Sequence, residues 1–155
     1  MTLTPARPTP PARPAAGFTL IELLVAVAII GILATLALPS YTAYLRRGDS
    51  AEGLAALNAY RATMEQYYQD RRSYGTGTFC AGTTSASVPP SNTGLSHFTM
   101  GCALTSAGYT LTATGSGPRT TGYVYTLDQA GTKGTTKYAG TTVSKACWVV
   151  KGGEC

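Results

Sequence analysis

The chain has 155 residues, of which only 12 % are charged, and a formal net charge of +5. This length suits one modest domain with an additional segment, and the low charge argues against a disordered tail. Four cysteines lie in the C-terminal half without C-x-x-C spacing. Two disulfides formed in an oxidising compartment are therefore favoured over a metal site or four buried thiols.

Residues 1–17 form a short cationic segment rich in proline, which does not suit a helix interior. The small residues Ala15, Ala16 and Gly17 come before the apolar stretch. An ordinary secretory signal instead places its cleavage site after that stretch. We therefore expect residues 1–17 to be a removable leader that keeps its positive end in the cytoplasm. Removing Arg7 and Arg13 with it lowers the net charge from +5 to +3.

The next segment, residues 18–45, is predicted to be a hydrophobic helix. Its first 21 residues, 18–38, carry a single charge, Glu22. As a helix they would be about 32 Å long, which matches a bilayer core. A carboxylate in such a helix costs up to roughly 3 kcal/mol, so Glu22 is either paired, functional or extended into the headgroups. Gly31 and Pro39 loosen the backbone, and Pro39 is expected to interrupt the helix.

Residues 46–155 are predicted to form a globular domain that begins with an amphipathic continuation of the same helix, to about Asp70. Its apolar positions recur at spacings of three and four, which places them on one face. These are Leu57, Tyr60, Met64, Tyr67 and Tyr68, with Glu52, Ala55, Ala59, Thr63, Gln66 and Gln69 opposite.

After the helix we expect a loop over residues 73–96 and then three short strands. Residues 98–104, 109–113 and 123–127 alternate apolar and polar side chains, which is typical of half-buried strands. The tail from Thr132 is interpreted as a segment pinned back onto the sheet. The predicted fold class is α+β: a long N-terminal helix whose apolar half protrudes and whose amphipathic half packs on a small antiparallel sheet.

Catalytic chemistry is not indicated. The one histidine, His97, has no partner at a recognisable spacing, and a surface or half-buried role is favoured. Phosphate-binding glycine motifs do not occur, and Asp128-Gln129 with Gly131 is interpreted as a turn and not a calcium loop. We therefore expect no enzyme activity, no cofactor and no metal.

The stretch from Gly17 to Glu22, GFTLIE, followed by an apolar helix with Pro39 near its end, resembles the N-terminus of type IV prepilins. Short motifs continue the resemblance to small and minor pilins, including DNA-receptor minor pilins. They are Tyr67-Tyr68 with Tyr74, residues 109–113, residues 126–129 with Gly131 and Lys133, and Cys147-Trp148. Where relatives often carry a cysteine, this chain has Gly122, so Cys147 needs another partner.

The resemblance implies that a prepilin peptidase cuts after Gly17 and methylates the new amine of Phe18. The available partner for Glu22 is then this new ammonium of Phe18, either its own, which is one helical turn away, or that of a neighbouring subunit in a filament. The protein would wait in the bacterial inner membrane, contact an assembly platform there, and join other pilin subunits in an extracellular pilus. The alternatives are a pseudopilin of a type II secretion system and a DNA-binding minor pilin.

Two finer expectations concern the C-terminal half. Among the three possible disulfide pairings we expect Cys80–Cys102, which joins a loop to the first strand, and Cys147–Cys155, which closes a short tail. Weak DNA binding is expected at Lys133, Lys137 and Lys145, although a merely solubilising surface is favoured over it.

Overall fold

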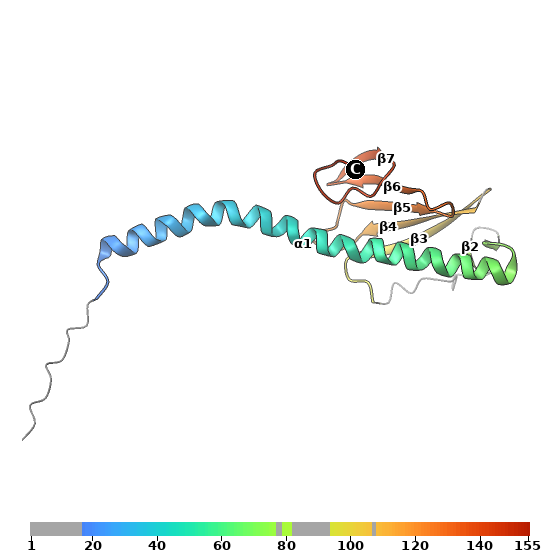
Figure 1. Ribbon diagram of the computed structural model, residues 1–155, viewed down its shortest axis with the longest axis horizontal. Helices are drawn as coiled ribbons and strands as arrows, with labels where there is room; N and C mark the ends of the chain where they lie inside the picture. The colour runs from blue at the N-terminus through green and yellow to red at the C-terminus, as the bar shows by residue number, and fades with distance from the viewer. Residues whose placement is uncertain (1–16, 77–78, 82–93, 107) are drawn as a thin grey trace, which may run out of the picture. The chain divides into compact units, whose positions relative to one another are not determined.

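The computed structural model describes residues 17–76, 79–81, 94–106 and 108–155 (Figure 1). The chain divides into two compact units, residues 1–39 and residues 40–155. The expected leader, apart from Gly17, lies outside the described residues, as does much of the loop expected at residues 73–96.

A single helix, α1 (Leu20–Arg71), confirms the expected long helix. It continues through Pro39, so the expected interruption there does not occur. Thr19 caps its first turn: the backbone N–H of Glu22 donates to Thr19 Oγ1 at 3.3 Å. This bond satisfies one of the N–H groups that have no partner within the helix.

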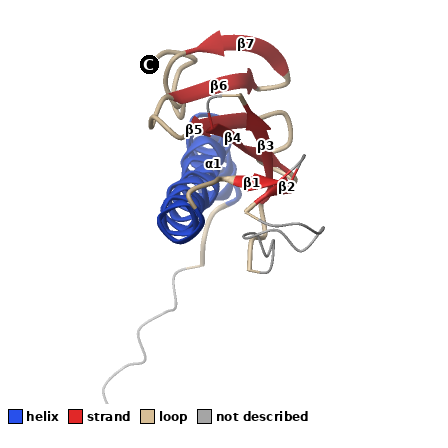
Figure 2. Cartoon of the chain, turned by 90° about the vertical axis from the view of Figure 1, so that its right-hand side faces the viewer, coloured by secondary structure: helices blue, strands red, loops and turns tan. Residues whose placement is uncertain are grey.

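The second unit contains a five-stranded antiparallel sheet in the order β3-β4-β5-β6-β7 (Figure 2). Its strands are β3 (Phe98–Thr105), β4 (Gly108–Gly115), β5 (Val124–Asp128), β6 (Lys133–Tyr138) and β7 (Thr141–Lys145). The three expected strands are confirmed, and β6 and β7 extend the sheet where only a pinned tail was expected. Two short strands, β1 (Gly75–Thr76) and β2 (Phe79–Cys80), pair separately within the expected loop.

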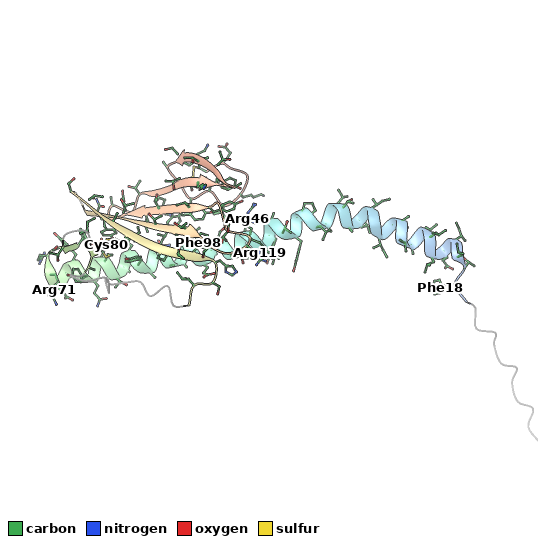
Figure 3. All side chains as sticks on the ribbon, turned by 180° about the vertical axis from the view of Figure 1, so that it is seen from behind. Phe18, Arg46, Arg71, Cys80, Phe98 and Arg119 are labelled. Atoms are coloured by element: carbon green, nitrogen blue, oxygen red, sulfur yellow. A yellow bond between two sulfur atoms is a disulfide. The ribbon has the colours of Figure 1, made fainter. Side chains whose placement is uncertain are left out.

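The core of this unit lies between α1 and one face of the sheet. The buried helix positions recur at intervals of three and four: Ser50, Gly53, Leu57, Tyr60 and Met64. The sheet contributes alternate side chains: Phe98, Tyr109, Leu111, Ala113, Tyr123, Tyr125 and Leu127. Figure 3 shows Phe98 between the helix and the sheet. A Cβ at position 53 would lie 2.7 Å from the Phe98 ring, so glycine allows the two elements to approach there.

Hydrogen bonds hold the tail after β7 against the sheet. Two disulfides cross-link the second unit as well. Val149 is fully buried, and its carbonyl accepts a hydrogen bond from the Tyr125 hydroxyl at 3.1 Å. Disulfides join Cys80 to Cys102 and Cys147 to Cys155, the pairing expected from the loops. The sequence separations are 22 and 8 residues, so each bond closes a local loop.

Candidate assembly helix and nucleic-acid interface

The predicted processing residues, Gly17 and Phe18, lie just before the beginning of α1. Gly17 is open: a Cβ there would meet nothing within 4 Å. Phe18 is 84 % exposed, and Glu22 is exposed on the first helical turn. A carboxylate on this turn is favoured by the positive end of the helix dipole and can also face an ammonium group close by.

The apolar part of α1 carries a long series of exposed hydrophobic side chains. The helix has a stretch of mean hydropathy 2.7, which is long and apolar enough to cross a membrane by length and composition. Large side chains from Leu20 to Leu38 are at least half exposed. Such a surface is covered by lipid or by other proteins in any stable environment.

The structure brings two of the three predicted DNA-contacting lysines onto one face of the sheet. Lys133 precedes the buried Thr135 by two residues, and Thr135 pairs directly with Lys145. Cross-strand partners and residues two apart share a face, so Lys133 and Lys145 lie on the same face. Beyond an irregularity in β6, Lys137 pairs with Val124, which places it on the opposite face.

Trp148 and the disulfide-closed tail adjoin these two lysines. Lys133 Nζ lies 4.8 Å from the centre of the Trp148 ring, and the indole N–H donates to the Thr126 carbonyl at 2.8 Å. Lys145 Nζ lies 3.6 Å from a carboxylate oxygen of Glu154, whose side chain is 84 % exposed. Because exposed ion pairs are weak, a phosphate can compete with Glu154 for Lys145.

His97 has charged partners that the sequence spacing did not indicate. Its Nδ1 lies 2.5 Å from Glu52 Oε2, and its Nε2 lies 3.7 Å from Asp49 Oδ1. The same Glu52 accepts the backbone N–H of Ser96, and Arg119 donates to Asp49 from Nε at 2.7 Å. His97 is half-buried, as expected, and its partners lie far from it in the sequence. Glu52 does not belong to a solvated helix face.

These contacts keep both carboxylates ionised. The hydrogen bond from Arg119 lowers the pKa of Asp49 despite its partial burial. Burial opposes ionisation of Glu52, but hydrogen bonds from His97 and from the backbone N–H of Ser96 outweigh it and lower its pKa. Figure 3 shows Arg119 near Arg46, at the end of this unit opposite Arg71 and Cys80.

The cluster joins α1 to the segments that flank the start of β3 and the end of β4. A histidine between two carboxylates could suggest general acid–base chemistry or a metal site. Among the residues that the structure describes, no group of three histidine, cysteine or acidic side chains is placed to hold a metal ion. The observed contacts support a structural role, in which charged groups hold two loops against the helix.

Comparison with known families links the chain to pilus proteins. Residues 39–123, more than half of the chain, match the family described as "Type IV minor pilin ComP, DNA uptake sequence receptor". Residues 12–38 match the prokaryotic N-terminal methylation motif. No solved structure gives a significant match.

Curated relatives include fimbrial protein EcpC of Eikenella corrodens, 44 % identical over 36 % of each chain. Type IV major fimbrial protein FimA of Dichelobacter nodosus is 46 % identical over 35 % of this chain and 34 % of its own. Type IV major pilin protein PilE1 of Neisseria gonorrhoeae is 37 % identical over 49 % of this chain and 44 % of its own. The matched region thus covers between about a third and somewhat less than half of the length of these relatives.

The methylation motif, the long helix on an antiparallel sheet and the match over residues 39–123 together place this non-enzymatic chain in the type IV pilin family, among the ComP-type minor pilins.

Proposed function

We propose that this chain is a minor subunit of a type IV pilus that polymerises through residues 18–45 and presents a DNA-binding surface on residues 46–155. The observation that carries this proposal is the family match over residues 39–123, whose description names a DNA uptake sequence receptor. The exposed apolar helix supports assembly. The two lysines that share a face beside Trp148 support contact with DNA.

The proposed route to the filament begins in the inner membrane. A prepilin peptidase removes residues 1–17 and methylates the amine of Phe18, and the chain waits in the membrane through its apolar helix. The assembly platform then inserts it among other pilin subunits. There the carboxylate of Glu22 pairs with the ammonium of a neighbouring Phe18, since an unpaired charge in an apolar core is costly.

The proposed DNA contact is electrostatic. Lys133 and Lys145 lie on one face, and Lys151 belongs to the adjoining loop closed by Cys147–Cys155. Each lysine that neutralises a phosphate releases a counterion, so the affinity falls as the salt concentration rises. These lysines position the backbone of DNA and do not by themselves read its sequence.

A gel-shift titration of the full chain in zwitterionic detergent tests this surface. Lys133→Gln with Lys145→Gln should weaken binding to a duplex and flatten the salt slope by up to about two units. Lys137→Gln is the matched control for each single variant, Lys133→Gln and Lys145→Gln, because it removes one positive charge from the opposite face of the sheet. We expect it to change the affinity less than about twofold.

Two results would contradict the proposed surface. The first is the absence of any shift at low salt with the wild-type chain. The second is a loss of affinity in Lys137→Gln as large as the loss in Lys133→Gln or in Lys145→Gln alone, which would show that binding depends on net charge and not on this face.

A further inference from the structure

The part of α1 that follows Pro39 carries a tyrosine–arginine cluster, which consists of Tyr41, Tyr44, Arg46 and Arg47. The two tyrosines are 60 % and 66 % exposed. Tyr41, Tyr44 and Arg47 recur at intervals of three, which places them along one face of the helix. Neither assembly through apolar side chains nor the proposed DNA contact accounts for the two arginines.

Both arginines of the cluster are held by aromatic rings. Arg47 Cζ lies 5.9 Å from the centre of the Tyr44 ring, one turn back towards the N-terminus. Arg46 Cζ lies 5.3 Å from the centre of the Tyr123 ring, which precedes β5. A ring positions a guanidinium group but carries no net charge, so both arginines keep their positive charge.

The acidic side chains that follow the cluster on α1 are already engaged. Asp49 accepts a hydrogen bond from Arg119 Nε at 2.7 Å, and the Glu52 carboxylate contacts His97 Nδ1. Within the part of the chain that the structure describes, neither arginine of the cluster forms an ion pair with a carboxylate. The fold therefore leaves two positive charges on this turn of the helix without an acidic partner.

The position of the cluster along α1 corresponds to the level of lipid headgroups. Tyr41 lies three residues and Arg47 nine residues beyond Leu38, the end of the apolar stretch, which is about 5 Å and about 14 Å along a helix. The headgroup layer is roughly 5–8 Å thick on each side of the hydrocarbon core. Helical side chains tilt towards the N-terminus, as the contact of Arg47 with Tyr44 shows, so this long side chain reaches back into that layer.

We propose that the tyrosine–arginine cluster binds the headgroups of anionic phospholipids at the outer surface of the membrane that residues 18–45 enter. A guanidinium group matches the geometry of a phosphate, and tyrosine rings favour the interface between lipid and water. The bound lipid holds the helix at a defined depth, because moving an arginine into the hydrocarbon core is costly. The proposal rests on the proposed membrane location, and it does not depend on filament assembly or on DNA binding.

An NMR titration of the full chain in lipid nanodiscs tests this contact. The discs hold one chain each and consist of phosphatidylcholine with a rising fraction of phosphatidylglycerol. We expect the side-chain Nε–H signals of Arg46 and Arg47 to shift with this fraction in a saturable manner. Arg71, in the last turn of α1, is the internal control, because it lies at the opposite end of the second unit from Arg46 (Figure 3). No saturable shift, or an equal shift at Arg71, would overturn the proposal.

Three variants assign the lipid preference to the charge of the cluster, with the Arg46 signal as the readout. Arg47→Gln should raise the phosphatidylglycerol fraction at half-saturation about fivefold, the effect expected of one basic residue at an anionic surface. Arg47→Lys keeps the charge, and Arg71→Gln removes a charge far from the cluster, so both should stay within about twofold of wild type. A titration of Arg47→Gln that coincides with that of wild type would contradict the proposal.

The same nanodiscs separate this inference from the proposed function. A chain that does not enter the discs would contradict the membrane location and the lipid contact together. A chain that enters them without responding to phosphatidylglycerol would contradict the lipid contact alone. Shifts that follow the number of chains per disc, and not the lipid composition, would identify a second subunit as the partner and overturn the assignment to lipid.

Discussion

At the scale of single residues, Glu22 is the charge that the apolar helix retains. Its backbone N–H is bound by the Thr19 side chain, so the start of α1 is capped without using the carboxylate. The carboxylate itself is exposed on the first turn. It therefore stays available for the partner that we propose, the amine of a neighbouring Phe18.

Replacing Glu22 by Ala should leave membrane insertion intact and strongly reduce incorporation into filaments. Removing one partner of a buried charge pair costs about 3–5 kcal/mol, because the other charge is left unpaired. The measurement is the ratio of subunit in sheared filaments to subunit in membranes. Thr19→Ala is the control, since it removes the cap and keeps the charge; equal incorporation of Glu22→Ala and wild type would refute the pairing.

The cluster around His97 predicts loss of stability in acid. The pKa values of Asp49 and Glu52 are lowered in the folded chain, so their contribution is present above their ordinary values of 3.8 and 4.5. It is lost as the pH falls through the lowered values, because protonation then favours the unfolded state. Urea unfolding at a series of pH values, monitored by Trp148 fluorescence, measures this dependence of the free energy of unfolding on pH.

The variant Glu52→Gln isolates one of the two carboxylates. We expect it to be less stable than wild type at pH 7 and to approach wild type as the pH falls through the lowered pKa of Glu52, because the wild-type carboxylate then becomes protonated. A stability difference that stayed constant over this range would show that the lowered pKa does not contribute.

At the scale of elements, the contact between α1 and the sheet determines the stability of the second unit. Leu57 is fully buried at this contact. Leu57→Ala should destabilise the unit by about 2–5 kcal/mol, because it removes buried apolar surface and leaves a cavity. Gln66→Ala, an exposed position of the same helix, should change the free energy of unfolding by less than about 0.5 kcal/mol. Similar losses in both variants would contradict the assigned packing.

The strands that the sequence predicted are those that face the helix. β3, β4 and β5 alternate apolar and polar residues because each covers the core on one side only. β6 and β7 were missed because their sequences, KGTTKY and TTVSK, show no such alternation. They lie after β5 in the sheet order, and Thr135 is the buried residue of β6. Backbone hydrogen bonding to neighbouring strands defines β6 and β7, and residue composition does not reveal such pairing.

The candidate site, like the sheet, could be predicted from the sequence only in part. Local patterns indicated the apolar helix, which the structure confirms, and they also suggested the processing residues and the lysines, whose roles are proposals. The contact between Glu52 and His97 joins residues 45 apart, and the division of the lysines between two faces depends on an irregularity in β6. Neither follows from local spacing, because both are set by tertiary packing and strand register.

At the scale of the molecule, the two units of the chain have surfaces of different character. Residues 18–38 expose apolar side chains that need lipid or other subunits around them. Residues 40–155 form a compact unit with a core and two disulfides, which suits the oxidising exterior. A filament subunit that carries a binding surface accounts for both.

Intact-mass analysis of filament protein tests the processing step of this account. The mature chain should begin at Phe18 and carry one N-methyl group, because Gly17 directly precedes the apolar helix. Filament protein that still contained residues 1–17 would show that the leader is not removed.

The most direct test of the central claim is DNA capture by sheared filaments. Filaments are prepared from cells that make the wild-type chain or the variant Lys133→Gln with Lys145→Gln, and the amounts of subunit and of bound labelled duplex are measured at low and physiological salt. We predict that both chains enter filaments equally and that wild-type filaments bind more DNA, with a steeper dependence on salt. Absence of the wild-type chain from filaments, or equal DNA capture by the two preparations, would contradict the account.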